Sequence, residues 1–248
     1  MKTVAIIEAR MGSTRLPKKT LMDVAGATLL ERVVERIGLA RTVNETVVAT
    51  SVNPGDDAIY ELCYKKGIQC FRGSEDDVLG RVYEAARKHG ADIILQCGAD
   101  CPFYDPELID LLAAILKWGG YSYAANDMKL TFPEGIDAHV VRFDALEASA
   151  KEAKDVQERE DTPRFIWNHP GRFPIFNLEA LPGSKLNRPE IRLTVDYKED
   201  MELAKFIYEK LYPVSPGFTA HELIDFLDGH PDWIRKNSHC EQRSAAYI

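Results

Sequence analysis

The sequence predicts an α/β fold, a single domain in which a mostly parallel sheet is flanked by helices. Over the first half of the chain, short apolar runs typical of buried strands alternate with amphipathic segments, in the order of βαβα units. The chain has 248 residues and 45% of them are hydrophobic, enough for one substantial core. We therefore treat residues 1–248 as one domain.

The predicted elements follow one another regularly up to residue 120. Strands are expected at residues 4–7, 46–50, 69–71 and 93–96, and helices at residues 29–37, 58–65, 78–88 and 107–118. Glycines follow the last two helices, where they favour helix termination. Ligands of such sheets bind at the carboxyl ends of the strands, so the loops after Ile7, Thr50 and Gln96 are expected to converge.

The second half of the chain is less regular. Prolines interrupt short apolar segments between residues 126 and 189, which predicts an insertion that leaves the sheet as a β arm. Alternating apolar residues predict a further strand at residues 191–195, followed by a long helix. The polar tail from Asn237 is expected to fray.

Composition excludes several classes of function. A net charge of −8 without a basic stripe argues against broad binding to nucleic acid. No apolar run is long enough for a membrane span or typical of a signal peptide, so a cytoplasmic protein is expected. The five cysteines lack zinc-finger spacing and are expected to be reduced thiols, and the six histidines show no metal-ligand spacing.

The segment after the first predicted strand is rich in groups that bind anions. Gly12 allows close approach to the backbone, Ser13 and Thr14 add donors, and Arg10 and Arg15 add positive charge. Neither Walker nor dinucleotide-binding spacing is present. A solvated basic loop is the alternative to a site for a nucleoside triphosphate.

Residues 9–19 resemble the signature loop of nucleotidyltransferases that activate sugars, most closely the cytidylyltransferases and their SpsF-like branch. The resemblance continues in separated blocks to about Leu211. It implies a fold like that of nucleotide-diphospho-sugar transferases. It also implies Mg²⁺-dependent transfer from CTP to a sugar acid or related acceptor, with release of pyrophosphate, in surface polysaccharide biosynthesis. A homodimer is expected, in which the segment 126–189 closes the acceptor site and pairs the subunits.

On this resemblance, positive and small residues would bind the nucleotide. Arg10, Arg15 and Lys19 would stabilise the triphosphate and act in catalysis together with Asp100. The expected nucleotide-binding residues are Ala9, Arg10, Gly12, Ser13, Arg15, Lys19, Thr50, Ser51 and Arg81. A plain strand-to-helix turn is an equal alternative for Thr50 and Ser51.

Two aspartates follow predicted strands and suit a hard cation. Asp100 stands where a carboxylate facing a phosphate loop can hold Mg²⁺, although a helix cap or turn is an equal alternative from the residues alone. The resemblance assigns Asp100 and Asp196 as the metal ligands. Asp105 is expected to cap the following helix.

The acceptor residues are assigned by resemblance as well. The segment around Glu134 and Asp137 matches the acceptor site of the family, and Asp161 lies in a second matching block that is equally consistent with a charged helix start. Glu134, Asp137 and Asp161 are therefore the expected acceptor-binding residues.

Five positions depart from the usual pattern of the family. Glu8 stands in place of Gln or Pro, Lys18 in place of Gly, and Gln96 in place of Arg. His139 replaces a common Glu, and Asp161 replaces a common His. Glu8 and Gln96 leave open a nucleotide-binding protein without turnover. A glycosyltransferase that uses a nucleotide sugar is a second alternative, since its fold also begins with a βα nucleotide-binding half and carries an acidic metal-binding motif.

Overall fold

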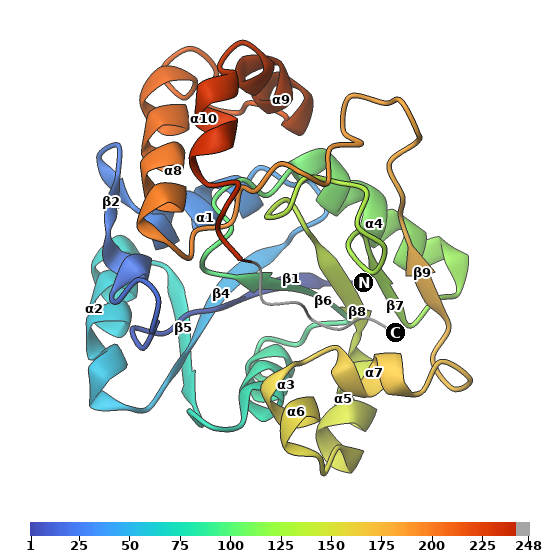
Figure 1. Cartoon of the computed structure of the whole chain (residues 1–248). Coiled ribbons are helices and arrows are strands. Elements are labelled where there is room, and N and C mark those ends of the chain that lie inside the picture. The colour runs from blue at the N-terminus through green and yellow to red at the C-terminus, as the bar shows by residue number, and fades with distance from the viewer. Residues whose placement is uncertain (242–248) are drawn as a thin grey trace.

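A seven-stranded mixed sheet forms the centre of the protein (Figure 1). The computed structural model describes residues 1–241. The strands of this sheet are β1 (Thr3–Glu8), β4 (Glu45–Ser51), β5 (Gln69–Gly73), β6 (Ile93–Gly98), β7 (Tyr123–Ala125), β8 (His139–Arg142) and β9 (Ile175–Asn177). Their order is β5-β4-β1-β6-β8-β7-β9, and β8 runs antiparallel to both neighbours while the other adjacent pairs are parallel. A separate hairpin pairs β2 (Asp23–Val24) with β3 (Ala27–Thr28).

Helices follow the strands much as predicted. They are α1 (Leu29–Ile37), α2 (Asp57–Lys66), α3 (Val78–Lys88), α4 (Pro106–Gly119), α5 (Phe143–Glu152), α6 (Val156–Glu160), α7 (Arg164–Asn168), α8 (Lys198–Lys210), α9 (Ala220–Asp228) and α10 (Pro231–Lys236). Short 3-10 helices lie at Lys19–Leu21 and Pro54–Asp56. Asp105 caps α4 by accepting hydrogen bonds from the Glu107 and Leu108 N–H groups, as expected. The α/β fold with helices on a mostly parallel sheet is thus confirmed.

The pleat of β1 divides the core between the two faces of the sheet. Val4 and Ile6 pack with residues of α3, α5 and α7, whereas Ala5 and Ile7 pack with residues of α1, α2 and α4. All four side chains are fully buried. Figure 1 shows α3, α5, α6 and α7 gathered on one side of the sheet and α1 on the other. Burial on both faces explains why the parallel strands are continuously apolar.

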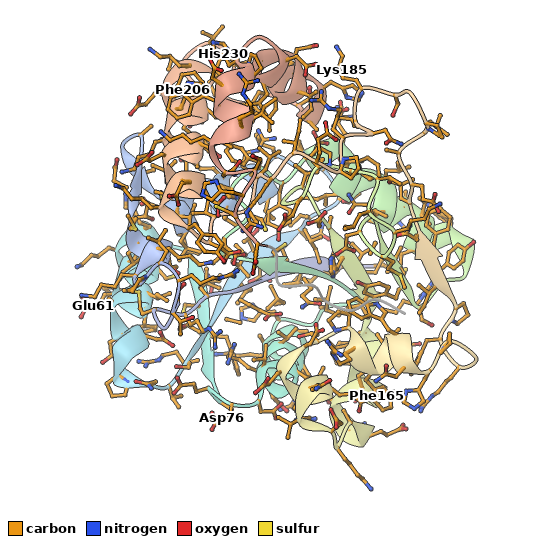
Figure 2. The ribbon with its side chains drawn as sticks, viewed as in Figure 1. Glu61, Asp76, Phe165, Lys185, Phe206 and His230 are labelled. Atoms are coloured by element: carbon orange, nitrogen blue, oxygen red, sulfur yellow. The ribbon has the colours of Figure 1, made fainter. Side chains whose placement is uncertain are left out.

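A third apolar cluster joins α8, α9 and α10 to α1 and α4. Phe206 of α8 stacks on Trp233 of α10 with ring centroids 4.0 Å apart, and its ring lies edge-on to that of His230. Figure 2 shows Phe206 and His230 close together at the outer end of this layer. Because α10 is held against α8, the residues that follow α10 return toward the sheet.

Three expectations for the second half of the chain need correction. The segment 126–189 does not form a β arm, because β8 and β9 join the main sheet and three helices lie between them. The strand expected at residues 191–195 is reduced to a single bridge between Glu134 and Arg192. The tail is not frayed at its start, because Asn237 is 1% exposed and donates to the Asp200 carboxylate. The rest of the expected frayed tail, residues 242–248, lies outside the described residues.

Within residues 1–241, no helix combines the length and the apolar character that crossing a bilayer requires.

Gly135 is placed where another residue does not fit. Its φ is +95°, and a Cβ at this position would lie 2.4 Å from the Thr194 nitrogen and 2.6 Å from the Leu193 carbonyl carbon. Both obstructing atoms belong to backbone. The close approach lets the Glu134 N–H donate to the Ile191 carbonyl and the Leu193 N–H donate to the Glu134 carbonyl.

We therefore expect Gly135→Ala to destabilise the protein. Left-handed strain and displacement of neighbouring backbone together cost about 2 kcal/mol or more, which corresponds to a fall in Tm of roughly 4–8 °C for a domain of this size. Thermal unfolding followed by circular dichroism measures the shift. Gly171→Ala is the control, since a Cβ at this exposed turn meets no atom within 4 Å. Equal Tm values for both variants would contradict the close packing at Gly135.

Candidate active site

A cavity of about 680 Å³ opens at the carboxyl ends of the central strands. The loop after β1 forms one wall, and the turn after β6, the start of α3 with the two residues Glu75 and Asp76 before it, the end of α6 and Asp196 complete the cavity. Nine expected site residues line this cavity, namely Ala9, Arg10, Gly12, Ser13, Arg15, Lys19, Arg81, Asp100 and Asp196. The fold therefore brings together segments that are up to 187 residues apart, from residue 9 to residue 196.

The loop after β1 is fixed by hydrogen bonds to its own backbone and to a buried carboxylate. The Met11 N–H donates to Asp56 Oδ1 at 2.7 Å, and Thr20 Oγ1 donates to the Arg10 carbonyl at 2.9 Å. A Cβ at Gly12 would meet no atom within 4 Å, so the space above this backbone is open to a ligand. Lys18 has a φ of 62°, a left-handed conformation that glycine adopts more easily. The position therefore favours glycine, the residue expected there from the family resemblance, and the backbone of Lys18 is strained.

Lys19 lies at the centre of the site. Its Nζ donates to Asp100 Oδ2 at 2.8 Å, to Asp196 Oδ1 at 2.8 Å and to the Val195 carbonyl at 2.9 Å. Burial disfavours the charged amine, but Asp100 and Asp196 outweigh this effect and raise the pKa of Lys19. The ammonium therefore stays charged and holds the two carboxylates together.

Asp196 also contacts two arginines. Arg15 Nη2 lies 2.7 Å from Asp196 Oδ1, and Arg192 Nη2 donates to Asp196 Oδ2 at 2.9 Å. Burial opposes ionisation of Asp196, but Lys19, Arg15 and Arg192 together lower its pKa. An ionised Asp196 is therefore part of the folded protein.

Arg192 was not predicted as a site residue, yet it connects the carboxylates behind the cavity. Its guanidinium donates to Asp200 Oδ1 at 3.0 Å and to Glu134 Oε1 at 2.7 Å, in addition to Asp196. A charged residue between Ile191 and Leu193, in a buried apolar segment, is the signal that would have identified it. Glu134 therefore supports Asp196 through Arg192 and does not line the cavity among the described residues.

Arg81 enters the cavity from α3. Its Nη1 donates to the Ser74 carbonyl and, at 3.4 Å, to the Glu75 carbonyl. Nε of Arg81 is buried without a hydrogen-bond partner in the described part of the chain. Glu8, on the cavity wall, is half-buried, and the loss of solvent around its carboxyl raises its pKa although Arg81 acts in the opposite direction. The Arg81 guanidinium is thus held at the cavity wall by the carbonyl groups of the loop before α3.

Four of the positions that depart from the expected family pattern lie in two pairs. Gln96 Nε2 donates to Glu8 Oε1 at 2.8 Å. His139 and Asp161 interact electrostatically, since Asp161 contributes to raising the pKa of His139. Lys18 belongs to neither pair.

The structure does not bring Thr50 and Ser51 to the cavity among the described residues. Both are buried at the end of β4, and the Ser51 hydroxyl donates to Asp56 Oδ2. Asp56 in turn accepts from the Met11 N–H. The Ser51 hydroxyl therefore stabilises the loop after β1 indirectly, through Asp56.

The remaining expected acceptor residues lie in a polar cluster beside the cavity. The Gly135 N–H donates to Asp137 Oδ2 at 3.0 Å, and burial and the negative charge of Asp127 raise the pKa of Asp137 to about 7. His139 Nε2 lies 2.9 Å from Asp127 Oδ2. Burial disfavours protonation of His139, but Asp127 outweighs it and raises the pKa to about 9.

This polar cluster is close to the aspartates of the cavity. Burial, Asp100 and Asp137 together raise the pKa of the Cys101 thiol, and Asp161 contributes to raising the pKa of Glu8. Asp161 itself contacts Arg164 at 3.3 Å. Asp137 and Asp161 therefore stand at the border of the cavity, although neither lines it in the described part of the chain.

The donor atoms of Asp100 and Asp196 fit a hard divalent cation. One carboxylate oxygen of each residue lies 2.8 Å from the same Lys19 nitrogen, so both oxygens point to a common place. Mg²⁺ commonly takes one or two carboxylates and completes its shell with water and phosphate oxygens. The two residues thus suit a cation that is shared with a phosphorylated ligand.

Comparison with known proteins gives results that agree with this geometry. A family model described as cytidylyltransferase matches residues 4–216. The spore coat polysaccharide biosynthesis protein SpsF of Bacillus subtilis (strain 168) is 36% identical over 234 residues, which cover 92% of this chain and 94% of that protein. A solved cytidylyltransferase from Leptospira borgpetersenii superposes with a TM-score of 0.86 at 29% identity and covers both chains completely.

A more distant structure shares the fold. The synthetase for CMP-2-keto-3-deoxy-manno-octonic acid, solved in complex with CTP, has a TM-score of 0.64 at 18% identity, with coverage of 85% of this chain and 100% of that one. The family model alone spans most of the sheet and every expected site residue. This chain therefore belongs to the cytidylyltransferase family.

Proposed function

We propose that this protein transfers the cytidylyl group of CTP to an oxygen of a sugar acid or related acceptor, with Mg²⁺, in surface polysaccharide biosynthesis. The observation that carries the proposal is the convergence of Arg10, Arg15 and Lys19 with Asp100 and Asp196 in one cavity. The cations suit a triphosphate and the carboxylates suit a divalent cation. The homodimer and the cytoplasmic location expected from the sequence belong to the same proposal.

The loop after β1 would bind the triphosphate. The space beside the Gly12 backbone is free, so a phosphate oxygen can approach it without steric conflict. Arg15 lines the same cavity. Lys19 is shared by the carboxylates of Asp100 and Asp196. When nucleotide binds, its ammonium is expected to turn from these carboxylates toward the phosphates.

Asp100 and Asp196 would hold the divalent cation, which neutralises charge on phosphate oxygens when bound. Arg192 keeps Asp196 oriented by its contact with Oδ2, which leaves Oδ1 directed into the cavity. The Asp100 side chain is 33% exposed and meets the cavity directly. The carboxylate of Asp196 is thus fixed by Arg192, and the carboxylate of Asp100 is accessible from the cavity.

The reaction that this arrangement supports is an in-line displacement. An acceptor oxygen attacks the α-phosphorus of CTP, the bond to the bridging oxygen breaks, and pyrophosphate leaves with its charge near Arg15 and Lys19. Positioning and charge stabilisation supply most of the catalysis in such reactions. A role for the SpsF-like branch in polysaccharide synthesis is supported by the name of the relative at 36% identity.

The polar cluster beside the cavity would bind an anionic acceptor. His139 has a pKa of about 9 and is positively charged at neutral pH, and Asp137 has a pKa of about 7 and is partly protonated there. The two ring nitrogens of His139 contact the Tyr123 hydroxyl and Asp127, so the imidazolium would attract the acceptor carboxylate through its charge, and hydroxyl groups would contact Asp137. A sugar acid combines these groups.

The central prediction concerns Asp100. With CTP, Mg²⁺ and a panel of sugar acids and phosphosugars, we expect the native chain to release pyrophosphate, and Asp100→Asn to lower kcat/KM by about 10²-fold or more. The reason is that a bound metal contributes several kcal/mol of charge stabilisation. A coupled pyrophosphate assay measures the rate.

Asp144→Asn at the start of α5 is the matched control and should keep native activity and the native Tm, and Asp100→Asn should keep the native circular dichroism spectrum at the assay temperature. Release with UTP instead of CTP would contradict the nucleotide assignment. Binding of a nucleotide sugar without pyrophosphate release would favour a glycosyltransferase. CTP binding without turnover over the whole panel would favour a binding protein.

The acceptor assignment predicts a pH dependence. As pH rises through about 7, Asp137 ionises, and as pH approaches about 9, His139 loses its charge. Both changes make the site more negative, so KM for an anionic acceptor should rise with pH while KM for CTP changes less. Asp137→Asn should remove the rise near pH 7 and keep the rise near pH 9. An unchanged pH profile in this variant would place the acceptor elsewhere.

A further inference from the structure

Three potential metal ligands converge outside the cavity, at the start of α8. One ligand atom each of Glu199, His239 and Cys240 lies within 4.8 Å of the other two. Bonds from zinc to oxygen, nitrogen and sulfur are about 2.0–2.3 Å long, which places ligand atoms of one ion roughly 3.5 Å apart. Small side-chain rotations would therefore bring all three to one ion.

These side chains are not engaged elsewhere within residues 1–241. The structure gives hydrogen bonds or ion pairs for many polar neighbours, including Lys236 with Glu202 at 2.6 Å, but none for the side chains of Glu199, His239 and Cys240. Cys240 is a free thiol. A carboxylate, an imidazole and a thiol therefore face one another without another function.

The position of the two C-terminal ligands is fixed by the fold. Phe206 stacks on Trp233 and thereby holds α10 against α8. Asn237, which follows α10, is buried, and its Nδ2 donates to the Arg192 carbonyl at 3.0 Å and to Asp200 Oδ1 at 2.8 Å. The Cys240 N–H closes the next turn on the Asn237 carbonyl at 2.9 Å. His239 and Cys240 are thus brought to Glu199 by an anchored turn.

From this convergence, we propose that Glu199, His239 and Cys240 form a binding site for a divalent transition metal of the zinc class. Imidazole and thiolate ligands favour zinc and its neighbours over Mg²⁺, which prefers oxygen. Binding forms a metal–sulfur bond and releases the Cys240 thiol proton to solvent. The site is chemically distinct from the pair Asp100 and Asp196, whose donor atoms are all oxygen.

The metal would fasten the C-terminal turn beside the nucleotide loop. The Glu241 carbonyl accepts from Arg15 Nη1 at 3.5 Å and from the Tyr197 hydroxyl at 3.4 Å. Arg15 in turn contacts Asp196. An ion at the start of α8 therefore stabilises the turn that touches Arg15, without touching the nucleotide itself.

Cobalt(II) tests the site because a cobalt–thiolate bond gives a near-ultraviolet charge-transfer band that oxygen ligands do not. The full chain is stripped with chelator, kept reduced in degassed buffer with excess Mg²⁺, and titrated with Co²⁺ alone. We expect the band to saturate at one equivalent and to disappear when Zn²⁺ is added. Isothermal titration with Zn²⁺ in buffers of different ionisation enthalpy should show proton release.

Variants identify the ligands. Cys240→Ser should abolish the band, and His239→Ala and Glu199→Gln should weaken cobalt binding by tenfold or more. Cys70→Ser and His221→Ala are the matched controls and should bind as the native chain does. No band in the native chain, or a band that survives Cys240→Ser, overturns the proposal. The titration contains no nucleotide, so its outcome is independent of cytidylyl transfer.

Discussion

The ammonium of Lys19, held between the carboxylates of Asp100 and Asp196, is the interaction around which the catalytic side of the protein is arranged. It connects the loop after the first strand to segments about 80 and 180 residues later. The cost of burying these charges is offset only because each has a partner. Removal of one partner leaves an uncompensated charge in the interior.

The charge count of this cluster bears on the proposed metal site. Four carboxylates, of Asp100, Glu134, Asp196 and Asp200, face three cations, of Arg15, Lys19 and Arg192. One negative charge is in excess when all are ionised. Such an excess suits the divalent cation that we propose, while the ion pairs hold the carboxylates in place.

Local sequence predicted the elements of the first half of the chain well. The helix at Leu29–Ile37 has the predicted bounds because its amphipathic pattern and its Thr28 cap agree. The loop residues from Ala9 to Lys19 meet Asp100 because parallel strands end at one edge of the sheet. The presence of these elements and the edge at which their loops meet thus follow from patterns within short windows.

The pairing of segments that lie far apart in the chain could not be predicted from local sequence. Ser51 is polar and follows a strand, as a ligand-binding residue would, yet its hydroxyl contacts Asp56. The bridge between Glu134 and Arg192 joins segments whose partners no local period identifies. Segment 126–189 joins the sheet through β8 and β9 because main-chain hydrogen bonds, which carry no sequence signature, determine the pairing.

Asn237 has a consequence for the order in which the protein is made. All seven strands of the sheet leave the ribosome before this residue does, so the sheet can form while the Arg192 carbonyl and Asp200 still lack the amide that pairs with them. An unpaired polar group in a buried position costs about 1–3 kcal/mol. A growing chain thus has all strands of its sheet before it has a settled charge cluster.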